Sequence, residues 1–102
     1  MQDSVKIFLD DQRPTPQGYY RTYTVEQTIA KLLTRQVTDL SLDNDLGEDL
    51  EGYKVLDWLE EQIYMDPSFP LPEITVHSAN ASRVNYMLRA IESIKKIKYG
   101  IY

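Results

Sequence analysis

The sequence lacks cysteine altogether, and its 102 residues include one histidine, one tryptophan and four glycines. Without cysteine there is no disulfide framework, no thiolate metal ligand and no cysteine nucleophile. No apolar run approaches the ~18 residues that a membrane helix needs, and the N-terminus shows no apolar signal-peptide core. These absences predict a cytoplasmic location and no membrane partner, and the length of the chain predicts one domain spanning residues 1–102.

Basic residues are scarce in most of the chain. The formal net charge is −5, and 15 of the 16 acidic residues fall within positions 1–73. An acidic surface does not attract nucleic acid phosphates, so we expect no extended surface for duplex nucleic acid. A basic run, Lys95, Lys96 and Lys98, occurs near the end and is typical of a helix C-terminus.

The hydrophobic pattern alternates between strand and helix periods. Strands are predicted over residues 4–9, 19–23, 37–42 and 73–76, where apolar and β-branched residues gather. The first helix starts at a capping box, Thr24 to Gln27. Apolar residues at helical spacing mark one face of each helix: Val25, Ile29, Leu32 and Leu33, then Tyr53, Leu56, Leu59 and Ile63, then Val84, Met87, Leu88, Ile91 and Ile94.

This order predicts a small α/β fold, a mostly parallel sheet with helices packed on it. One connection is unusual, because Pro14, Pro16 and Gly18 exclude a helix between the first two strands. About eight extended residues span ~26 Å, which suffices to return beside a strand of ~20 Å. A parallel pair and a hairpin both remain open here.

Polar clusters follow three of the predicted strands: Asp10 and Asp11, then Asp43, Asn44 and Asp45, then His77 and Ser78 with Asn80. Ligands of open parallel sheets bind outside the carboxyl ends of the strands. If these strands are neighbours, their ends fall within ~10 Å of one another. Carboxylates so close repel unless a cation joins them, and hard oxygen ligands suit Mg²⁺ or Mn²⁺. Solvated turn residues are the competing interpretation.

Two further residues have the chemistry of a phosphate site. Arg13, held by Pro14, suits bidentate phosphate binding, with a surface salt bridge to Asp45 or Glu48 as the alternative. His77 could act as a general acid or base, or donate to a phosphate oxygen. A half-buried histidine bonded to a backbone carbonyl is the structural alternative.

Three segments then suggest a family: IFLDDQRP at 7–14, LSLDNDLG at 40–47 and VHSAN at 76–80. In this order and spacing they resemble the cyclic-phosphate processing receiver-like domain, a divergent branch of the response-regulator receiver superfamily. The resemblance implies a receiver-like fold, a truncated version of the flavodoxin-like arrangement.

The resemblance also implies roles for single residues. Receivers bind Mg²⁺ at an acidic pair, here Asp10 and Asp11, and carry a phosphoacceptor at the position of Asp43. Ser78 matches the hydroxyl that contacts the phosphoryl group, and the branch adds four residues, Arg13, Asp45, His77 and Asn80. The expected metal ligands are Asp10, Asp11, Asp43 and Asp45; the expected catalytic residues are Asp43, His77 and Arg13; the expected substrate contacts are Arg13, Ser78 and Asn80.

The function implied is metal-dependent hydrolysis of a cyclic or activated phosphate, such as a 2′,3′-cyclic phosphate or a cyclic nucleotide. The expected partner is then a small phosphate-containing ligand or an RNA end. A non-catalytic module that binds a phosphate ligand or a protein is the alternative. Two departures from the family pattern separate it from the enzyme: Asn44, where the branch usually has histidine, and Ala81 with Arg83, where the branch favours proline and glycine. The lack of a recognisable receiver lysine disfavours a phosphoacceptor role in signalling.

Overall fold

The computed structural model describes residues 4–10, 13–43, 51–77 and 81–100. Its strands are β1 (Val5–Leu9), β2 (Tyr20–Thr22), β3 (Val37–Asp43) and β4 (Glu73–His77), and its helices are α1 (Val25–Leu32), α2 (Glu51–Met65) and α3 (Ala81–Tyr99). The predicted order of elements is confirmed, and each strand begins and ends within one residue of its predicted limits. Within the described ranges, no helix is long and apolar enough to cross a membrane.

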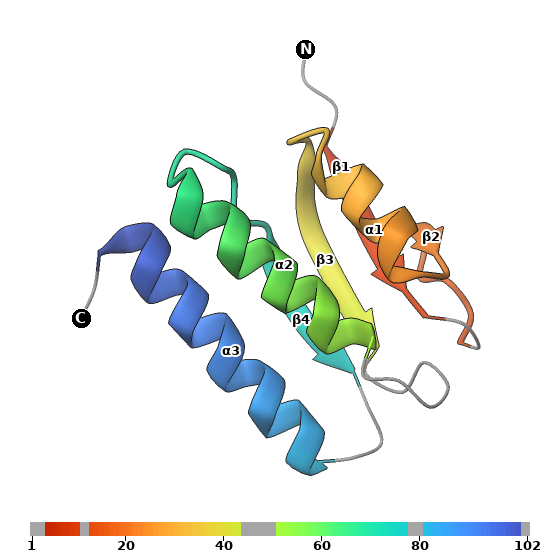
Figure 1. Ribbon diagram of the computed structural model, residues 1–102. Coiled ribbons are helices and arrows are strands. Elements are labelled where there is room, and N and C mark those ends of the chain that lie inside the picture. The colour runs from red at the N-terminus through yellow and green to blue at the C-terminus, as the bar shows by residue number, and fades with distance from the viewer. Residues whose placement is uncertain (1–3, 11–12, 44–50, 78–80, 101–102) are drawn as a thin grey trace.

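The four strands form one sheet in the order β2-β1-β3-β4, and every neighbouring pair is parallel. The carboxyl ends of β1, β3 and β4 therefore meet at one edge of the sheet (Figure 1). The small α/β fold with a parallel sheet is confirmed, and its strand arrangement is consistent with a receiver-like fold.

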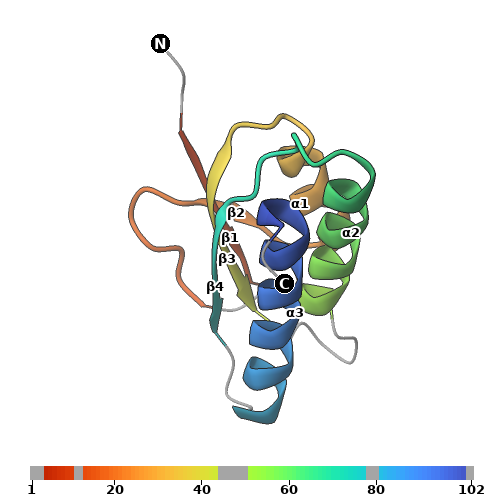
Figure 2. The same cartoon turned by 90° about the vertical axis from the view of Figure 1, so that its left-hand side faces the viewer.

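The connection from β1 to β2 contains no helix in its described part, as expected. Residues 13–19 pass over the sheet face opposite the helices (Figure 2), and the two strands pair in parallel with Leu9 opposite Thr22. The hairpin alternative is therefore wrong. Gly18 has φ +89, a left-handed conformation that glycine adopts without steric cost, and it precedes Tyr19, whose N–H donates to Pro16 O at 3.2 Å.

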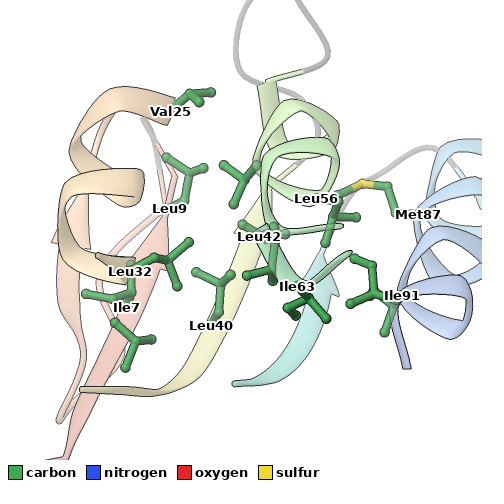
Figure 3. Packing of buried hydrophobic residues seen from close by; sticks show 14 of the residues in the cluster. Ile7, Leu9, Val25, Leu32, Leu40, Leu42, Leu56, Ile63, Met87 and Ile91 are labelled. Carbon is green, nitrogen blue, oxygen red and sulfur yellow. The ribbon is translucent and has the colours of Figure 1, made fainter. Parts of the chain in front are cut away.

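All three helices cover the same face of the sheet, as Figure 2 shows. Alternating strand residues point toward them, and Leu40 and Leu42 of β3 lie at the centre of the apolar layer (Figure 3). The buried core contains Ile7, Leu9, Val25, Leu32, Val37, Leu40, Leu42, Val55, Leu56, Leu59, Ile63, Phe69, Met87, Ile91 and Ile94. Because strand side chains alternate, the residues between these apolar positions face the other side of the sheet.

The capping box is confirmed, with one difference. Thr24 is the N-cap of α1, and its hydroxyl accepts the Gln27 N–H at 3.1 Å. The Gln27 side chain accepts the N–H of Tyr23, one residue before the cap, at 2.8 Å. The first turn of α1 is therefore fixed from both sides, which orients the helix against β1 and β2.

Two residues predicted for the apolar helix faces are exposed. Leu33 is 57% exposed, because α1 ends at Leu32 and Leu33 serves as its C-cap. Leu88 is 45% exposed, although its neighbour Met87 is buried. Neither residue therefore belongs to the buried side of its helix. Leu33 lies beyond the last turn of α1, and Leu88 falls outside the buried arc of α3.

Candidate functional site

Three ionisable side chains gather at the carboxyl edge of the sheet. Asp10 follows β1, Asp43 ends β3 and His77 ends β4, with Asp43 and His77 directly opposite each other in the parallel register. Each offers one ligand atom, and these atoms all lie within 4.8 Å of one another. The sheet therefore brings one residue from each of the three predicted polar clusters into one group.

Asp10 is completely buried, with 0% of its surface exposed. Its Oδ1 accepts the backbone N–H of Arg13 at 3.0 Å, and its Oδ2 lies 3.0 Å from Nε2 of His77. Its own N–H donates to Thr22 O at 3.2 Å, which continues the pairing of β1 with β2 by one residue. The carboxylate is thus fixed by the backbone on one side and by an imidazole on the other.

His77 is the centre of the group. Its Nδ1 lies 2.9 Å from Oγ of Ser41, and its Nε2 contacts Asp10. The imidazole stacks on the ring of Phe8, with centroids 4.8 Å apart and planes 5° apart. The stack holds the ring in one plane. Because the side chain is 18% exposed, the ring still borders solvent. The alternative of a bond to a backbone carbonyl is not what the structure shows, because Ser41 and Asp10 are the partners of the two ring nitrogens.

Asp43 is 5% exposed, and the first turn of α2 packs closely against its backbone. A Cβ at Gly52 would stand 2.6 Å from the carbonyl oxygen of Asp43 and 3.0 Å from Cε of Met87. Glycine is therefore required for the first turn of α2 to pack against the end of β3. This contact couples the position of Asp43 to the packing of α2 on α3.

Arg13 lies at the solvent side of the group. Its side chain is 51% exposed, and Nε is 3.9 Å from Oδ2 of Asp10. A pair at this distance with one exposed partner is weak, so the guanidinium can take another anion. The expected salt-bridge partners Asp45 and Glu48 lie outside the described residues.

Four predicted site residues also fall outside the described part of the chain: Asp11, Asp45, Ser78 and Asn80. The roles predicted for them stay predictions. Two residues that contact the group were missed by the sequence analysis, namely Ser41 and Phe8. Strand alternation contains the signal, because Ser41 lies two residues before Asp43 and Phe8 two before Asp10, on the same face.

Arg21 and Tyr19 both contact the ring of Phe8, next to the group of Asp10, Asp43 and His77. The guanidinium carbon of Arg21, on β2, lies 5.7 Å from the centroid of the Phe8 ring, and the Tyr19 ring meets Phe8 edge-on at 6.3 Å. Arg21 also donates from Nε to Oγ1 of Thr15 at 2.8 Å. Phe8 is therefore covered on the open face of the sheet and is only 6% exposed.

Comparison with known proteins identifies the family of the chain. The model of the cyclic-phosphate processing receiver domain matches residues 5–93, which include all four strands and most of α3. No curated protein and no solved structure matches the chain. Because the matched range contains Asp10, Asp43 and His77 and covers most of the sequence, the chain belongs to the family of cyclic-phosphate processing receiver domains.

Proposed function

We propose that the protein hydrolyses a cyclic phosphate, with the help of a divalent cation, at the edge formed by β1, β3 and β4. The observation that carries this proposal is the pair of buried carboxylates of Asp10 and Asp43 beside the imidazole of His77, with ligand atoms within 4.8 Å. Carboxylates removed from water repel each other strongly, and a cation between them offsets that repulsion. The family supplies the substrate class.

The donor set fits a divalent cation. Carboxylate oxygens are the ligands that Mg²⁺ and Mn²⁺ take, and such ions keep open positions for a phosphate. A ligand can approach from the side where His77 and Arg13 remain partly exposed. Asp11 and Asp45 are proposed as further ligands, and Ser78 and Asn80 as substrate contacts, on the basis of the resemblance.

In the proposed reaction a water oxygen adds to phosphorus and one of the two ester P–O bonds of the ring breaks. The products are a phosphomonoester and a free hydroxyl, whose oxygen takes up the proton that water gives away. A bound divalent cation would polarise a phosphoryl oxygen and assist the deprotonation of water. Arg13 contributes a guanidinium that pairs with two phosphate oxygens, and its backbone bond to Asp10 fixes the start of its side chain.

His77 bears on a second candidate function. A general acid must reach the leaving oxygen through a ring nitrogen, but both nitrogens of His77 contact protein side chains, Ser41 and Asp10. To protonate a leaving group, Nε2 would have to release Asp10. This observation favours, as the second candidate, a module that binds a phosphate ligand without turning it over.

Turnover separates the two functions. Purified protein is incubated with 2′,3′-cyclic and 3′,5′-cyclic nucleotides in Mg²⁺, in Mn²⁺ and in chelator, and the products are resolved by chromatography. We expect a nucleoside monophosphate to form only with metal, and Asp43→Asn to abolish it. Asp39→Asn, a change of the same kind on the same face of β3 but far from the group, should keep full activity. Binding of the nucleotides without any product would replace hydrolysis by the binding function.

A further inference from the structure

We propose that His77 is itself a ligand of the cation, through Nε2 and together with Asp10 and Asp43, and that the site therefore selects a first-row transition ion such as Mn²⁺ over Mg²⁺. This inference rests on the proposed cation site and goes beyond it, because it assigns the histidine to the metal and not to proton transfer. It is carried by three contacts of the imidazole, with Asp10, Ser41 and Phe8.

The first contact is the distance between His77 and Asp10. Nε2 lies 3.0 Å from Oδ2 of Asp10. Two ligands at right angles, each about 2.1 Å from an ion, are also about 3.0 Å apart. The distance between Nε2 and Oδ2 in the metal-free hydrogen bond thus equals the distance expected between two adjacent ligand atoms of one ion. An ion can therefore bind both atoms while their separation stays at 3.0 Å.

The second contact, between His77 and Ser41, allows the imidazole to change tautomer when a metal binds. Nε2 can bind a metal only if the ring proton is on Nδ1, and Nδ1 faces Oγ of Ser41 at 2.9 Å. A serine hydroxyl both donates and accepts hydrogen bonds, so it suits either tautomer. It donates to Nδ1 while Nε2–H bonds to Asp10, and it accepts from Nδ1–H when Nε2 is a ligand. Ser41 is therefore a positioning residue for the metal-bound tautomer.

The third contact fixes the ring plane. The imidazole lies flat on Phe8, with 5° between the planes, and Phe8 is itself buried. Rotation of the ring away from Asp10 would break this stack and the contact with Ser41 together. The imidazole is consequently confined to one plane beside Asp10 before any ion arrives, which reduces the ordering cost of binding.

The chemistry of the donor set then determines selectivity. Mg²⁺ takes oxygen ligands and demands a near-ideal octahedron, whereas an imidazole nitrogen favours transition ions. A group of two carboxylates and one imidazole, all within 4.8 Å, is a mixed oxygen and nitrogen set. Mn²⁺ is the probe of choice, because it accepts both donors and is paramagnetic.

The chain offers a clean test, because His77 is its only histidine. Any imidazole nitrogen coupled to bound Mn²⁺ must come from His77, provided that a purification tag has been removed. Pulsed electron paramagnetic resonance of the Mn²⁺-loaded protein should show ¹⁴N modulation from imidazole. His77→Gln should remove that modulation and weaken Mn²⁺ binding on the order of 10-fold or more, with a smaller effect on Mg²⁺.

Ser41→Ala provides a second variant in case His77→Gln does not fold. It should weaken Mn²⁺ binding on the order of 10-fold and retain the ¹⁴N modulation. Thr75→Ala is the matched control, because Thr75 pairs with Ser41 across β3 and β4 and is exposed. Bound Mn²⁺ without nitrogen coupling would overturn this inference and leave the cation site standing. No binding of Mn²⁺ or Mg²⁺ at millimolar concentration would overturn the metal-dependent function as well.

Discussion

The imidazole of His77 lies flat against the ring of Phe8, with centroids 4.8 Å apart and planes 5° apart. The two residues come from β4 and β1, which are separated in the sheet by β3. The stack therefore crosses the strand that ends at Asp43. It ties the outer two strands of the site together on the face opposite the helices.

Phe8→Leu keeps an apolar side chain but removes the stacked ring. We expect a loss of about 1–2 kcal/mol in the free energy of unfolding, measured in urea, and weaker Mn²⁺ binding, because the imidazole loses its fixed plane. Phe69→Leu is the matched control, since Phe69 packs on Trp58 far from the site. It should lower stability to a similar extent and leave the Mn²⁺ affinity unchanged. An identical affinity for wild type and Phe8→Leu would contradict the positioning role.

Gly52→Ala tests the coupling between α2 and Asp43. The added Cβ would meet Asp43 O at 2.6 Å, so the helix start or the end of β3 must move. We expect the free energy of unfolding to fall by about 1–3 kcal/mol and the affinity for Mn²⁺ to fall with it. Gly18→Ala meets nothing within 4 Å, and its positive φ costs about 1–2 kcal/mol. That control should lose stability alone, and a Gly52→Ala protein with unaltered affinity would refute the coupling.

Arg13→Ala should weaken the binding of inorganic phosphate or a nucleoside monophosphate, measured by calorimetry in the presence of metal. The expected loss is about 1.5–3 kcal/mol, the value of a hydrogen bond to a charged group. Fold stability should change little, because the side chain is half-exposed and its pair with Asp10 is long at 3.9 Å. Arg35→Ala, at the opposite edge of the sheet, should bind phosphate as wild type does. Equal affinity in Arg13→Ala would remove Arg13 from the site.

Asp66 predicts a pH dependence of stability away from the site. The hydroxyl of Ser68 and then the guanidinium of Arg35 hold the pKa of the Asp66 carboxyl below its usual value of 3.8. Because the folded pKa is lowered, the stabilisation is present above pH ~4 and is lost as pH falls through the folded pKa. Asp66→Asn should therefore be less stable than wild type at pH 7, and the difference should shrink at pH 2–3. A difference that is constant with pH would contradict this assignment.

Much of the fold could be predicted because its signals are local. Each signal predicts the structure of the segment in which it lies. Examples are the alternation in residues 5–9 and 37–43, the capping box at Thr24 and the prolines before Tyr19. The direction of β2 could not be decided from the local sequence, because residues 10–18 are long enough for either a parallel pair with β1 or a hairpin. In the parallel register Leu9 lies opposite Thr22, and the hydroxyl of Thr22 lies 2.7 Å from that of Thr28 of α1 in the core, a contact between a strand and a helix that has no local signal in the sequence.

The site was predictable in part for the same reason. Polar residues at strand ends mark the edge, so Asp10, Asp43 and His77 could be proposed from the sequence. Strand alternation places Ser41 and Phe8 on the same face as Asp43 and Asp10, but it could not predict that both residues contact His77. Their role depends on which strands are neighbours, and sheet order is a tertiary property.

We propose one cation site formed by Asp10, Asp43 and His77, and the thermal response of the protein to Mn²⁺ tests this site most directly. Mn²⁺ at 100 times its dissociation constant should stabilise wild type by about 2.7 kcal/mol and raise Tm accordingly. Asp43→Asn should abolish this rise, with a metal-free Tm no lower than that of wild type, because one of two neighbouring buried carboxylates loses its charge. Asp39→Asn should retain the full rise. The same Mn²⁺-induced rise in all three proteins would contradict the site.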